Sequence, residues 1–352
     1  MTFIRKLVAS TALGVLAASG PLAAQEKTEF RVAWSIYVGW MPWGYLEDSG
    51  IMDKWADKYG IDVEIVQIND YVESINQYTA GAFDGVSATN MDTLSIPAGG
   101  GVDTTALIVG DFSNGNDAVI VKGDTDLAGL SGKSINLVEL SVSHYLLARA
   151  LDSVDLREAD LDGVVNTSDA DMIAAFATDD VEAVVTWNPL VSTILEDPTA
   201  TKLFDSSDIP GEIIDLMVVN TDVLDANPDF GKAMVGAWYE VMSLMQAGDE
   251  AVLTAMAEAS GTDLAGYKAQ LASTEMFYAP ADAVAFAEGA DLPQTMVSVA
   301  EFLFDKGILG EGAPSADFVG VAYPGGVTTG DSNNIKFRFD TTYMQMAADG
   351  GL

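Results

Sequence analysis

Three of the six tryptophans in this chain lie in one stretch, Trp34-Ser35-Ile36-Tyr37-Val38-Gly39-Trp40-Met41-Pro42-Trp43-Gly44-Tyr45. The apolar run 30–34 leads into it, and Gly39 and Pro42 interrupt it. This order predicts a strand over 30–34, then a loop, then a helix that begins near Pro42 and continues through Tyr59, because proline suits the first turn of a helix. In an open α/β sheet, ligands bind in the crevice beyond the carboxyl ends of the strands. The stretch is therefore predicted to lie at a ligand site.

The aromatic side chains of this stretch have two interpretations. Trp34, Tyr37 and Trp40 follow the end of the predicted strand, where a loop has little core to fill, so we expect them to form the wall of a pocket. Trp43 and Tyr45 fall on the predicted helix, where they would serve equally well as core beneath it.

Strand and helix signals alternate along the chain that follows. Strands are predicted over 62–68, where polar and apolar residues alternate, and over 83–89 and 104–109. A helix is predicted over 70–81, with Asp70 as its N-cap. This alternation predicts an α/β fold, in which helices cover both faces of a parallel sheet.

A second unit begins near Asn116. Its predicted elements are the strands 117–122, 134–138 and 183–187 and the helix 143–151. The last strand ends in Trp187-Asn188-Pro189, and a further helix is predicted to start at that proline. Beyond Asn220 the chain is predicted to be chiefly amphipathic helix.

The composition is strongly acidic. The chain has 53 Asp and Glu residues against 16 Lys and Arg residues, a formal net charge of −37. Nucleic acid is excluded as a partner, because its recognition needs basic patches. The acidic surface is either an adaptation to salty surroundings, where self-repulsion is screened, or a solvated face with no bearing on function.

The first 24 residues predict a secretory signal peptide that is cleaved after Ala24. Arg5 and Lys6 precede an apolar run over 7–18, and small residues follow it. The run is too short to span a bilayer, and no later stretch supplies a span. The chain has no cysteine, so it holds no disulfide and no thiolate metal site. We expect an exported protein that resides in the periplasm.

Three motifs occur in order along the mature chain. Residues 78–86 contain the pattern G-x-x-D-G, residues 137–147 read as a strand, a loop and a helix start, and residues 183–190 contain A-x-x-x-W-x-P. In their order and spacing they resemble the periplasmic substrate-binding proteins of the nitrate/sulfonate/taurine class of ABC importers. The tryptophan-rich first loop and the tail 338–344 look like the subgroup associated with urea carboxylases, for which urea and guanidine are the implied ligands.

The resemblance implies a type II periplasmic binding protein, an α/β protein of two lobes with parallel-rich sheets, two hinge crossings and a helical C-terminal part. Lobe 1 would comprise residues 28–111 and 217–352, and lobe 2 residues 112–216. The ligand would lie between lobes that close on it by a hinge motion. The implied partner is an ABC permease in the inner membrane, a monomer is expected, and no cofactor or metal is expected.

Five loops are expected to face the crevice between the lobes, and none of them contains a lysine or an arginine. These loops span residues 34–45, 89–93, 139–144, 186–190 and 210–215. An anion could still bind at helix N-termini, but the carboxylates of these loops would oppose it. Carboxylates beside aromatic faces instead suit a small planar cation such as guanidinium, whose N–H groups they accept. Urea would need donors for its oxygen, which Asn90, Ser143, His144 or Asn188 could supply.

Each candidate carboxylate has a structural alternative. Asp92 could contact the ligand or only cap the helix that follows it. Glu139 ends an apolar strand, so we expect it to be buried and to contact the ligand, because a buried carboxylate needs a partner. Asp215 belongs either to the hinge or to the site, and Glu212 is expected to be exposed to solvent. Asp92, Glu139 and Asp215 are predicted to act together with Trp187, which ends a strand before a proline.

The only histidine, His144, excludes a multi-histidine metal site and is expected to form hydrogen bonds at a helix start. The sequence contains no G-x-S-x-G, no G-x-x-x-x-G-K and no H-E-x-x-H motif. We therefore expect a binding protein rather than an enzyme, with guanidinium favoured over urea and over a sulfonate, taurine or nitrate anion. The enzyme alternative, a relative of the pyrimidine synthases that share this fold, is cytosolic in type and conflicts with export. A sensor role beside transport stays open.

Overall fold

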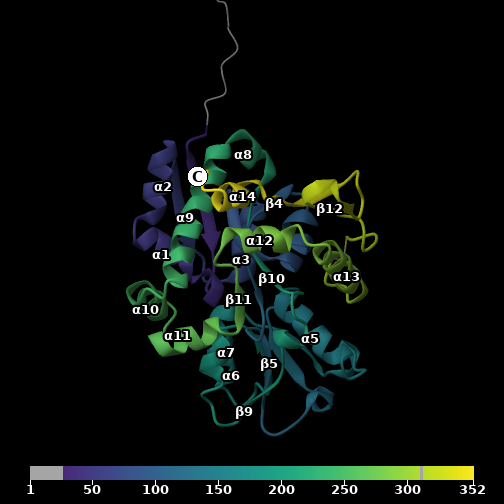
Figure 1. Ribbon diagram of the computed structural model, residues 1–352. Coiled ribbons are helices and arrows are strands. Elements are labelled where there is room, and N and C mark those ends of the chain that lie inside the picture. The colour runs from purple at the N-terminus through teal and green to yellow at the C-terminus, as the bar shows by residue number, and fades with distance from the viewer. Residues whose placement is uncertain (1–26, 310–311) are drawn as a thin grey trace, which may run out of the picture.

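The computed structural model describes residues 27–309 and 312–352, and their strands form two separate sheets (Figure 1). The predicted signal peptide lies outside the described residues. β1 (Glu29–Trp34) runs parallel to β2 (Asp62–Gln67) and to β3 (Gly85–Thr89). Every residue of β3 is buried, as expected for a strand in the interior of a sheet that is covered on both faces.

The first loop turns directly into helix, as the sequence predicts. A single turn, η1 (Val38–Trp40), leads into α1 (Met41–Asp48), which has Pro42 in its first turn. The prediction that this helix continues through Tyr59 is wrong, because Gly50 adopts a left-handed conformation with φ of 72° and separates α1 from α2 (Ile51–Tyr59). Trp43 belongs to the core: its ring stacks on Trp238 with the ring centroids 4.7 Å apart.

The next helix, α3 (Tyr71–Thr79), is capped as predicted, since Asp70 accepts a hydrogen bond from the Glu73 N–H at 2.9 Å. After β3 the chain forms α4 (Asn90–Thr93) and the turn η2 (Leu94–Ala98).

Two neighbouring antiparallel strands of the first sheet lead the chain into the second sheet and back from it. β4 (Thr104–Ser113) belongs to the first sheet, and after it the chain enters the second sheet at β5 (Ala118–Lys122). The chain returns to the first sheet at β10 (Ile214–Asn220), which pairs with both β3 and β4. The strand predicted over 104–109 is thus longer at its carboxyl end. This extension places Asp111 directly opposite Asp215.

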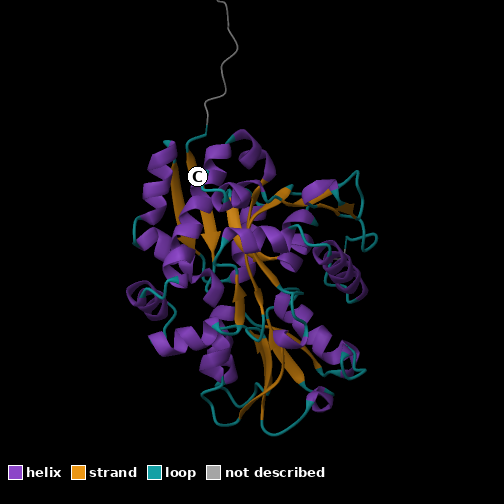
Figure 2. Ribbon diagram, viewed as in Figure 1, coloured by secondary structure: helices purple, strands orange, loops and turns teal. Residues whose placement is uncertain are grey.

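The second sheet has the strand order β7-β6-β8-β5-β9. Its remaining strands are β6 (Ser134–Leu137), β7 (Gly163–Asn166), β8 (Ala183–Thr186) and β9 (Ala200–Asp205). β6 is parallel to β7 and β8, whereas β5 is antiparallel to β8 and β9. Its helices are α5 (Val142–Asp152), α6 (Met172–Phe176) and α7 (Leu190–Ile194). In Figure 2 these strands and helices form the lower part of the molecule.

The part of the chain after β10 is mainly helical and packs on the first sheet. Its helices are α8 (Thr221–Ala226), α9 (Pro228–Gln246), α10 (Glu250–Ala259), α11 (Leu264–Leu271), α12 (Pro280–Ala287), α13 (Asp291–Asp305) and α14 (Thr342–Ala348). It also adds the short strands β11 (Thr274–Met276), β12 (Gly320–Ala322), β13 (Thr328–Thr329) and β14 (Ile335–Phe339) to the first sheet. The sequence indicated only the helices. Within residues 27–309 and 312–352, none of the helices has the length and apolar character needed to cross a membrane.

Candidate functional site

A small cavity lies where elements of the two sheets meet. It is lined by Tyr37, Trp40, Tyr71, Thr89, Asp117, Val142, Trp187, Ile213 and Asp215, and the empty space between them, open solvent included, is about 240 Å³. Most lining residues lie at or after the carboxyl ends of β1, β2, β3, β6 and β8, and the others, Asp117, Ile213 and Asp215, lie where the chain passes between the sheets. That is the position at which open α/β sheets bind ligands. Only about 10 Å³ of this space is open to the centre of a water-sized sphere, which is roughly room for one water molecule.

Four aromatic rings form a continuous wall of this cavity. Tyr37 meets Trp40 edge to face with the ring centroids 5.1 Å apart, and Trp40 contacts Tyr71 at 5.7 Å. Tyr71 in turn meets Trp187 at 5.5 Å. The Trp187 Nε1–H donates a hydrogen bond to the carbonyl oxygen of Ile36 at 3.0 Å, which fixes the indole across the first loop. The first three rings come from the first sheet's loops and Trp187 from the second sheet, so the wall spans both.

Two aspartates lie opposite each other next to this aromatic wall. Asp111 on β4 and Asp215 on β10 are directly paired in the antiparallel register, and both are buried. The Tyr37 hydroxyl donates to Asp111 Oδ1 at 2.8 Å. The Oδ2 atoms of both aspartates are buried without a hydrogen-bond donor from any other described residue. Burial raises the pKa of both carboxyl groups, and the negative charge of Asp111 raises the pKa of Asp215 further.

Asp92 supports the wall from the side of α4. Its Oδ2 accepts hydrogen bonds from the Tyr71 hydroxyl at 2.7 Å and from the Thr89 hydroxyl at 2.9 Å. The same oxygen accepts the N–H of Val142, the first residue of α5, at 3.1 Å. Burial raises the pKa of Asp92 to about 6, although these hydrogen bonds favour the ionised form. Asp92 therefore both positions Tyr71 and caps a helix of the other sheet.

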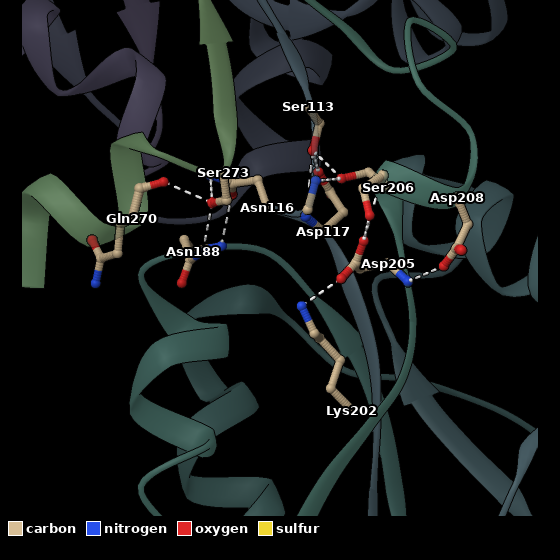
Figure 3. Close-up of polar contacts among 12 residues, drawn as sticks. Ser113, Asn116, Asp117, Asn188, Lys202, Asp205, Ser206, Asp208, Gln270 and Ser273 are labelled. Atoms are coloured by element: carbon tan, nitrogen blue, oxygen red, sulfur yellow. Dashed lines mark hydrogen bonds and ion pairs between the residues drawn. The ribbon is translucent and has the colours of Figure 1, made fainter.

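Asp117 lines the cavity where the chain enters the second sheet. Ser113 donates to Asp117 Oδ2 at 2.5 Å, and the Ser113 and Ser206 hydroxyls are 2.7 Å apart, so the two connections between the sheets are tied together. Figure 3 shows these three side chains in contact. Burial raises the pKa of Asp117 to about 7. No lysine, arginine or histidine is among the residues that line the cavity.

Further hydrogen bonds join the first sheet's loops to the second sheet. The Val38 N–H donates to the Asn188 carbonyl oxygen at 3.2 Å, and the Tyr71 N–H donates to Asp169 Oδ1 at 3.1 Å. Asn188 also donates two hydrogen bonds, from its backbone N–H to Asn116 Oδ1 at 3.0 Å and from its side-chain amide to the Ser273 hydroxyl at 3.4 Å (Figure 3). The two halves are therefore in direct contact around the cavity.

The structure brings four of the predicted site residues to the cavity wall: Tyr37, Trp40, Trp187 and Asp215. Asp92 lies behind Tyr71. Trp34 belongs to the core beneath α1, where a Cβ on Gly44 would lie 2.7 Å from its Cζ2 atom. The alternative of core packing therefore describes Trp34, and the predicted pocket wall begins at Tyr37.

Two other predicted residues, Asn90 and His144, serve the framework around the site. Asn90 accepts the Ile214 N–H at 3.0 Å and donates to the Glu212 carbonyl oxygen at 3.1 Å, so it holds the start of β10. His144 accepts the Leu140 N–H through Nδ1 at 3.1 Å, while Nε2 contacts a Glu158 carboxylate oxygen at 2.9 Å. His144 thus forms hydrogen bonds at the start of a helix, as its position in the sequence predicts.

Ser143 is buried in the first turn of α5, and its hydroxyl has no hydrogen-bond partner among the described residues. Glu212, expected at the surface, is only partly exposed and binds the Arg149 guanidinium through both carboxylate oxygens, at 2.8 and 2.9 Å. It is thereby neutralised outside the cavity lining.

The expectation that Glu139 is buried is wrong. β6 ends at Leu137, and the chain then turns outward, so that Glu139 is exposed and Leu140 is 45% exposed with φ of 61°. Glu139 does not line the cavity. A strand of only four residues leaves the position two residues beyond its end in the turn rather than in the crevice.

Sequence reasoning missed Asp111, Asp117 and Tyr71. Asp111 follows the predicted strand 104–109 after one glycine. It therefore has the strand-end position from which Glu139 was predicted to contact the ligand. Tyr71 falls within the helix predicted over 70–81, and its neighbours in sequence carry no signal of a site. Neither its contact with Asp92 nor that with Trp187 has a local pattern, because both partners come from distant elements. Across residues 27–309 and 312–352, no group of three or more His, Asp and Glu residues is arranged to hold a metal ion.

Comparison with solved structures identifies the fold class. The alkanesulfonate-binding protein from Xanthomonas axonopodis pv. citri, bound to MOPS, superposes with a TM-score of 0.68 at 17% identity, over 82% of this chain and 96% of that one. The periplasmic nitrate-binding protein from Synechocystis PCC 6803 superposes with a TM-score of 0.56 at 12% identity, over 93% and 99%. The molecule has the periplasmic binding protein fold, and the predicted fold class is confirmed.

The chain belongs to the NMT1-like family, whose model matches residues 31–260. A protein named as a binding protein in Brucella abortus (strain 2308) is 26% identical over 198 residues, which are 55% of this chain and 60% of that protein. The match thus spans less than two thirds of that relative's length.

Proposed function

We propose that this chain is the solute-binding component of an ABC importer in the periplasm and that it captures guanidinium between two closing lobes. The lobes are residues 28–111 with 217–352, and residues 112–216. The partner is a permease in the inner membrane. Support for the carrier role comes from the family, the fold and the position of the cavity between the two sheets.

One observation carries the choice of ligand: among the described residues, the ionisable side chains in the cavity lining are tyrosines and carboxyl groups. Asp117 and Asp215 line it, and Asp111 lies against Asp215. Guanidinium is planar and presents N–H donors around its whole edge. It also carries the positive charge that neutralises carboxylates. Its face fits against aromatic rings, and its edge fits carboxylate oxygens.

An anion is disfavoured for a second reason. The N-terminus of a helix such as α5 can hold a negative group when its first N–H groups are free. Here the first N–H of that helix, on Val142, already donates to the carboxylate of Asp92, and the next, on Ser143, donates to the Ser141 hydroxyl. Sulfonate or nitrate would therefore meet a carboxylate where it needs donors. The proteins of similar fold that bind such anions are under 25% identical to this chain and support the fold only.

The same reasoning favours a carrier over an enzyme. The side chain of the only histidine is engaged with the Leu140 N–H and with Glu158, outside the cavity. The cavity thus presents binding surfaces, aromatic rings and carboxyl groups, rather than a nucleophile beside a base.

Calorimetric titration of the purified chain with guanidine, urea, taurine and nitrate in parallel tests the proposal. Guanidine is expected to bind most tightly, to raise the melting temperature and to reduce the scattering radius as the lobes close. Tighter binding of taurine or nitrate would overturn the cation assignment. Tighter binding of urea would support the carrier role but overturn the preference for a charged ligand. If none of the four solutes changes melting or radius, the carrier proposal loses its support.

A further inference from the structure

The two carboxyl groups on β4 and β10 are buried next to each other without enough donors among the described residues to compensate them. Asp111 and Asp215 lie opposite each other, both buried, and each keeps a buried Oδ2 without a donor from any other described residue. Two carboxylates in contact cannot both be ionised in a buried setting at moderate cost. One proton shared between them removes the repulsion and supplies the missing donor.

Among the residues that the structure describes, none brings a positive charge to the surroundings of the pair. Tyr37 from the first loop donates its hydroxyl to Asp111, and Thr274 on β11 contacts that tyrosine hydroxyl at 3.3 Å. Asp117 adds negative charge from the connection to the second sheet. The phenols of Tyr267 on α11 and Tyr278 after β11 also lie within the field of Asp111. Every titratable group that faces the pair is therefore acidic, and its charge can be neutralised only by a proton or by a cation from the cavity.

The pair is connected to the cavity on one side only. Asp215 lines the cavity, whereas Asp111 Oδ2 lies against the first loop, where a Cβ on Gly39 would be 2.6 Å from it. A ligand in the cavity thus reaches the pair through Asp215. Asp111 senses the ligand through its neighbour.

We propose that Asp111 and Asp215 share one proton while the cavity is empty and that bound guanidinium replaces this proton, so that capture of the cation releases one proton to water. The inference rests on the proposed function and adds a coupling to it. The charge balances, because one positive charge enters the site as another leaves. The released proton comes from the carboxyl group, and no covalent bond to the ligand forms. Binding then strengthens as the proton concentration falls.

The direct test is titration of the whole mature chain with guanidinium chloride at pH 7, in phosphate and in Tris at equal ionic strength. Phosphate and Tris have different enthalpies of protonation. The difference between the binding enthalpies observed in the two buffers therefore gives the number of protons released. Release of up to one proton for each guanidinium bound is expected. Affinity should rise with pH by up to tenfold per unit and level off once the empty pair has lost its proton.

Variants assign the proton to this pair. In Asp111→Asn the amide donates to Asp215 in place of the shared proton, so release should fall to near zero while guanidine still binds. Asp215→Asn should lose both the release and at least tenfold in affinity. Asp117→Asn is needed because Asp117 lines the same cavity and has its pKa raised to about 7. It should retain most of the release. Asp57→Asn, at an exposed position on α2, is the matched control for an aspartate-to-asparagine change and should match the parent.

The outcomes separate the two proposals. Tight binding of guanidine with equal heats in both buffers and no dependence on pH would overturn the proton exchange and leave the proposed function standing. Release that persists in both Asp111→Asn and Asp215→Asn would assign the proton elsewhere and also overturn the exchange. If guanidine does not bind at any pH, both proposals fail. The unmodified chain decides the matter alone if a variant does not fold.

Discussion

The carboxylate of Asp92, on α4 beside the first sheet, accepts the N–H of Val142, which opens α5 beside the second sheet, at 3.1 Å. The same oxygen accepts two hydroxyl groups of its own half. One buried acceptor thus joins the cavity wall to the facing helix, and it occupies the helix N-terminus that an anionic ligand would otherwise use.

Replacing Asp92 by alanine should destabilise the protein. The Tyr71 hydroxyl, the Thr89 hydroxyl and the Val142 N–H would lose their acceptor, and a buried donor without a partner costs about 1–3 kcal/mol. Urea-induced unfolding of the ligand-free protein measures the loss. Asp92→Asn is the matched comparison, because its amide oxygen keeps one acceptor, and it should lose less. Equal stability of the alanine variant and the parent would show that these bonds contribute nothing net.

The loss of guanidine affinity should follow Asp215 rather than Glu139. Asp215 is buried in the cavity wall, so Asp215→Asn removes a charge-assisted hydrogen bond worth roughly 1.5–3 kcal/mol, about tenfold to a hundredfold or more in the dissociation constant. Glu139 is exposed, so Glu139→Gln should change affinity less than twofold. Calorimetry with guanidine and with neutral urea tests both variants, and urea should lose less in Asp215→Asn. A larger loss in Glu139→Gln would place the ligand elsewhere.

The aromatic wall should contribute through its faces. Trp40→Leu keeps an apolar side chain in the cavity lining but removes the ring, so guanidine affinity should fall by about 0.5–2 kcal/mol, the range of a cation–π contact. Trp43→Phe is the control, since that ring stacks on Trp238 in the core outside the cavity lining. It should lower the melting temperature without a comparable loss of affinity. The reverse pattern would argue against stacking at Trp40.

The ligand-free protein should lose stability as the pH rises from about 4 to above 7. The pKa of Asp92 is raised to about 6 and that of Asp117 to about 7, both mainly by burial, whereas the unfolded chain titrates near 4. Between these values the folded state holds more protons, so the free energy of unfolding falls with rising pH, by up to about 1.4 kcal/mol per unit for each proton of difference. Urea unfolding from pH 4.5 to 8 checks the sign. Stability that rises across this window would contradict the raised pKa values.

Salt should stabilise the protein through its acidic surface. With a formal net charge of −37, repulsion between surface carboxylates opposes the folded state, and added salt screens it over a Debye length of about 8–10 Å at 0.1–0.15 M. The melting temperature should therefore rise with sodium chloride up to moderate ionic strength. Sucrose at matched osmolality separates screening from general exclusion effects. Salt-independent melting would mean that the surface charge has no such cost.

Some features of the molecule follow from local sequence. The strand into Trp34, the helix start at Pro42 and the Asp70 cap depend on residues within a few positions of each other, and all three occur in the structure. Trp187 directly follows a strand, and Tyr37 and Trp40 lie in the loop and first turn after one. The carboxyl ends of parallel strands converge on one edge of a sheet. The place of these residues at the cavity is therefore readable from order and spacing.

Other features were decided only by the tertiary structure. Asp111 and Asp215 are opposed because β4 continues beyond Gly110 and pairs with a strand about a hundred residues later, in a register that is shifted by irregularities near this point. No local pattern encodes the register between distant strands, and a shift of one residue would turn either side chain to the other face. In the same way Glu139 resembles a buried strand-end carboxylate in sequence, but the turn at Leu140 carries it into solvent. The residue types at the site can be read from local sequence. The contact through which Asp111 and Asp215 share a proton depends instead on how distant strands pair.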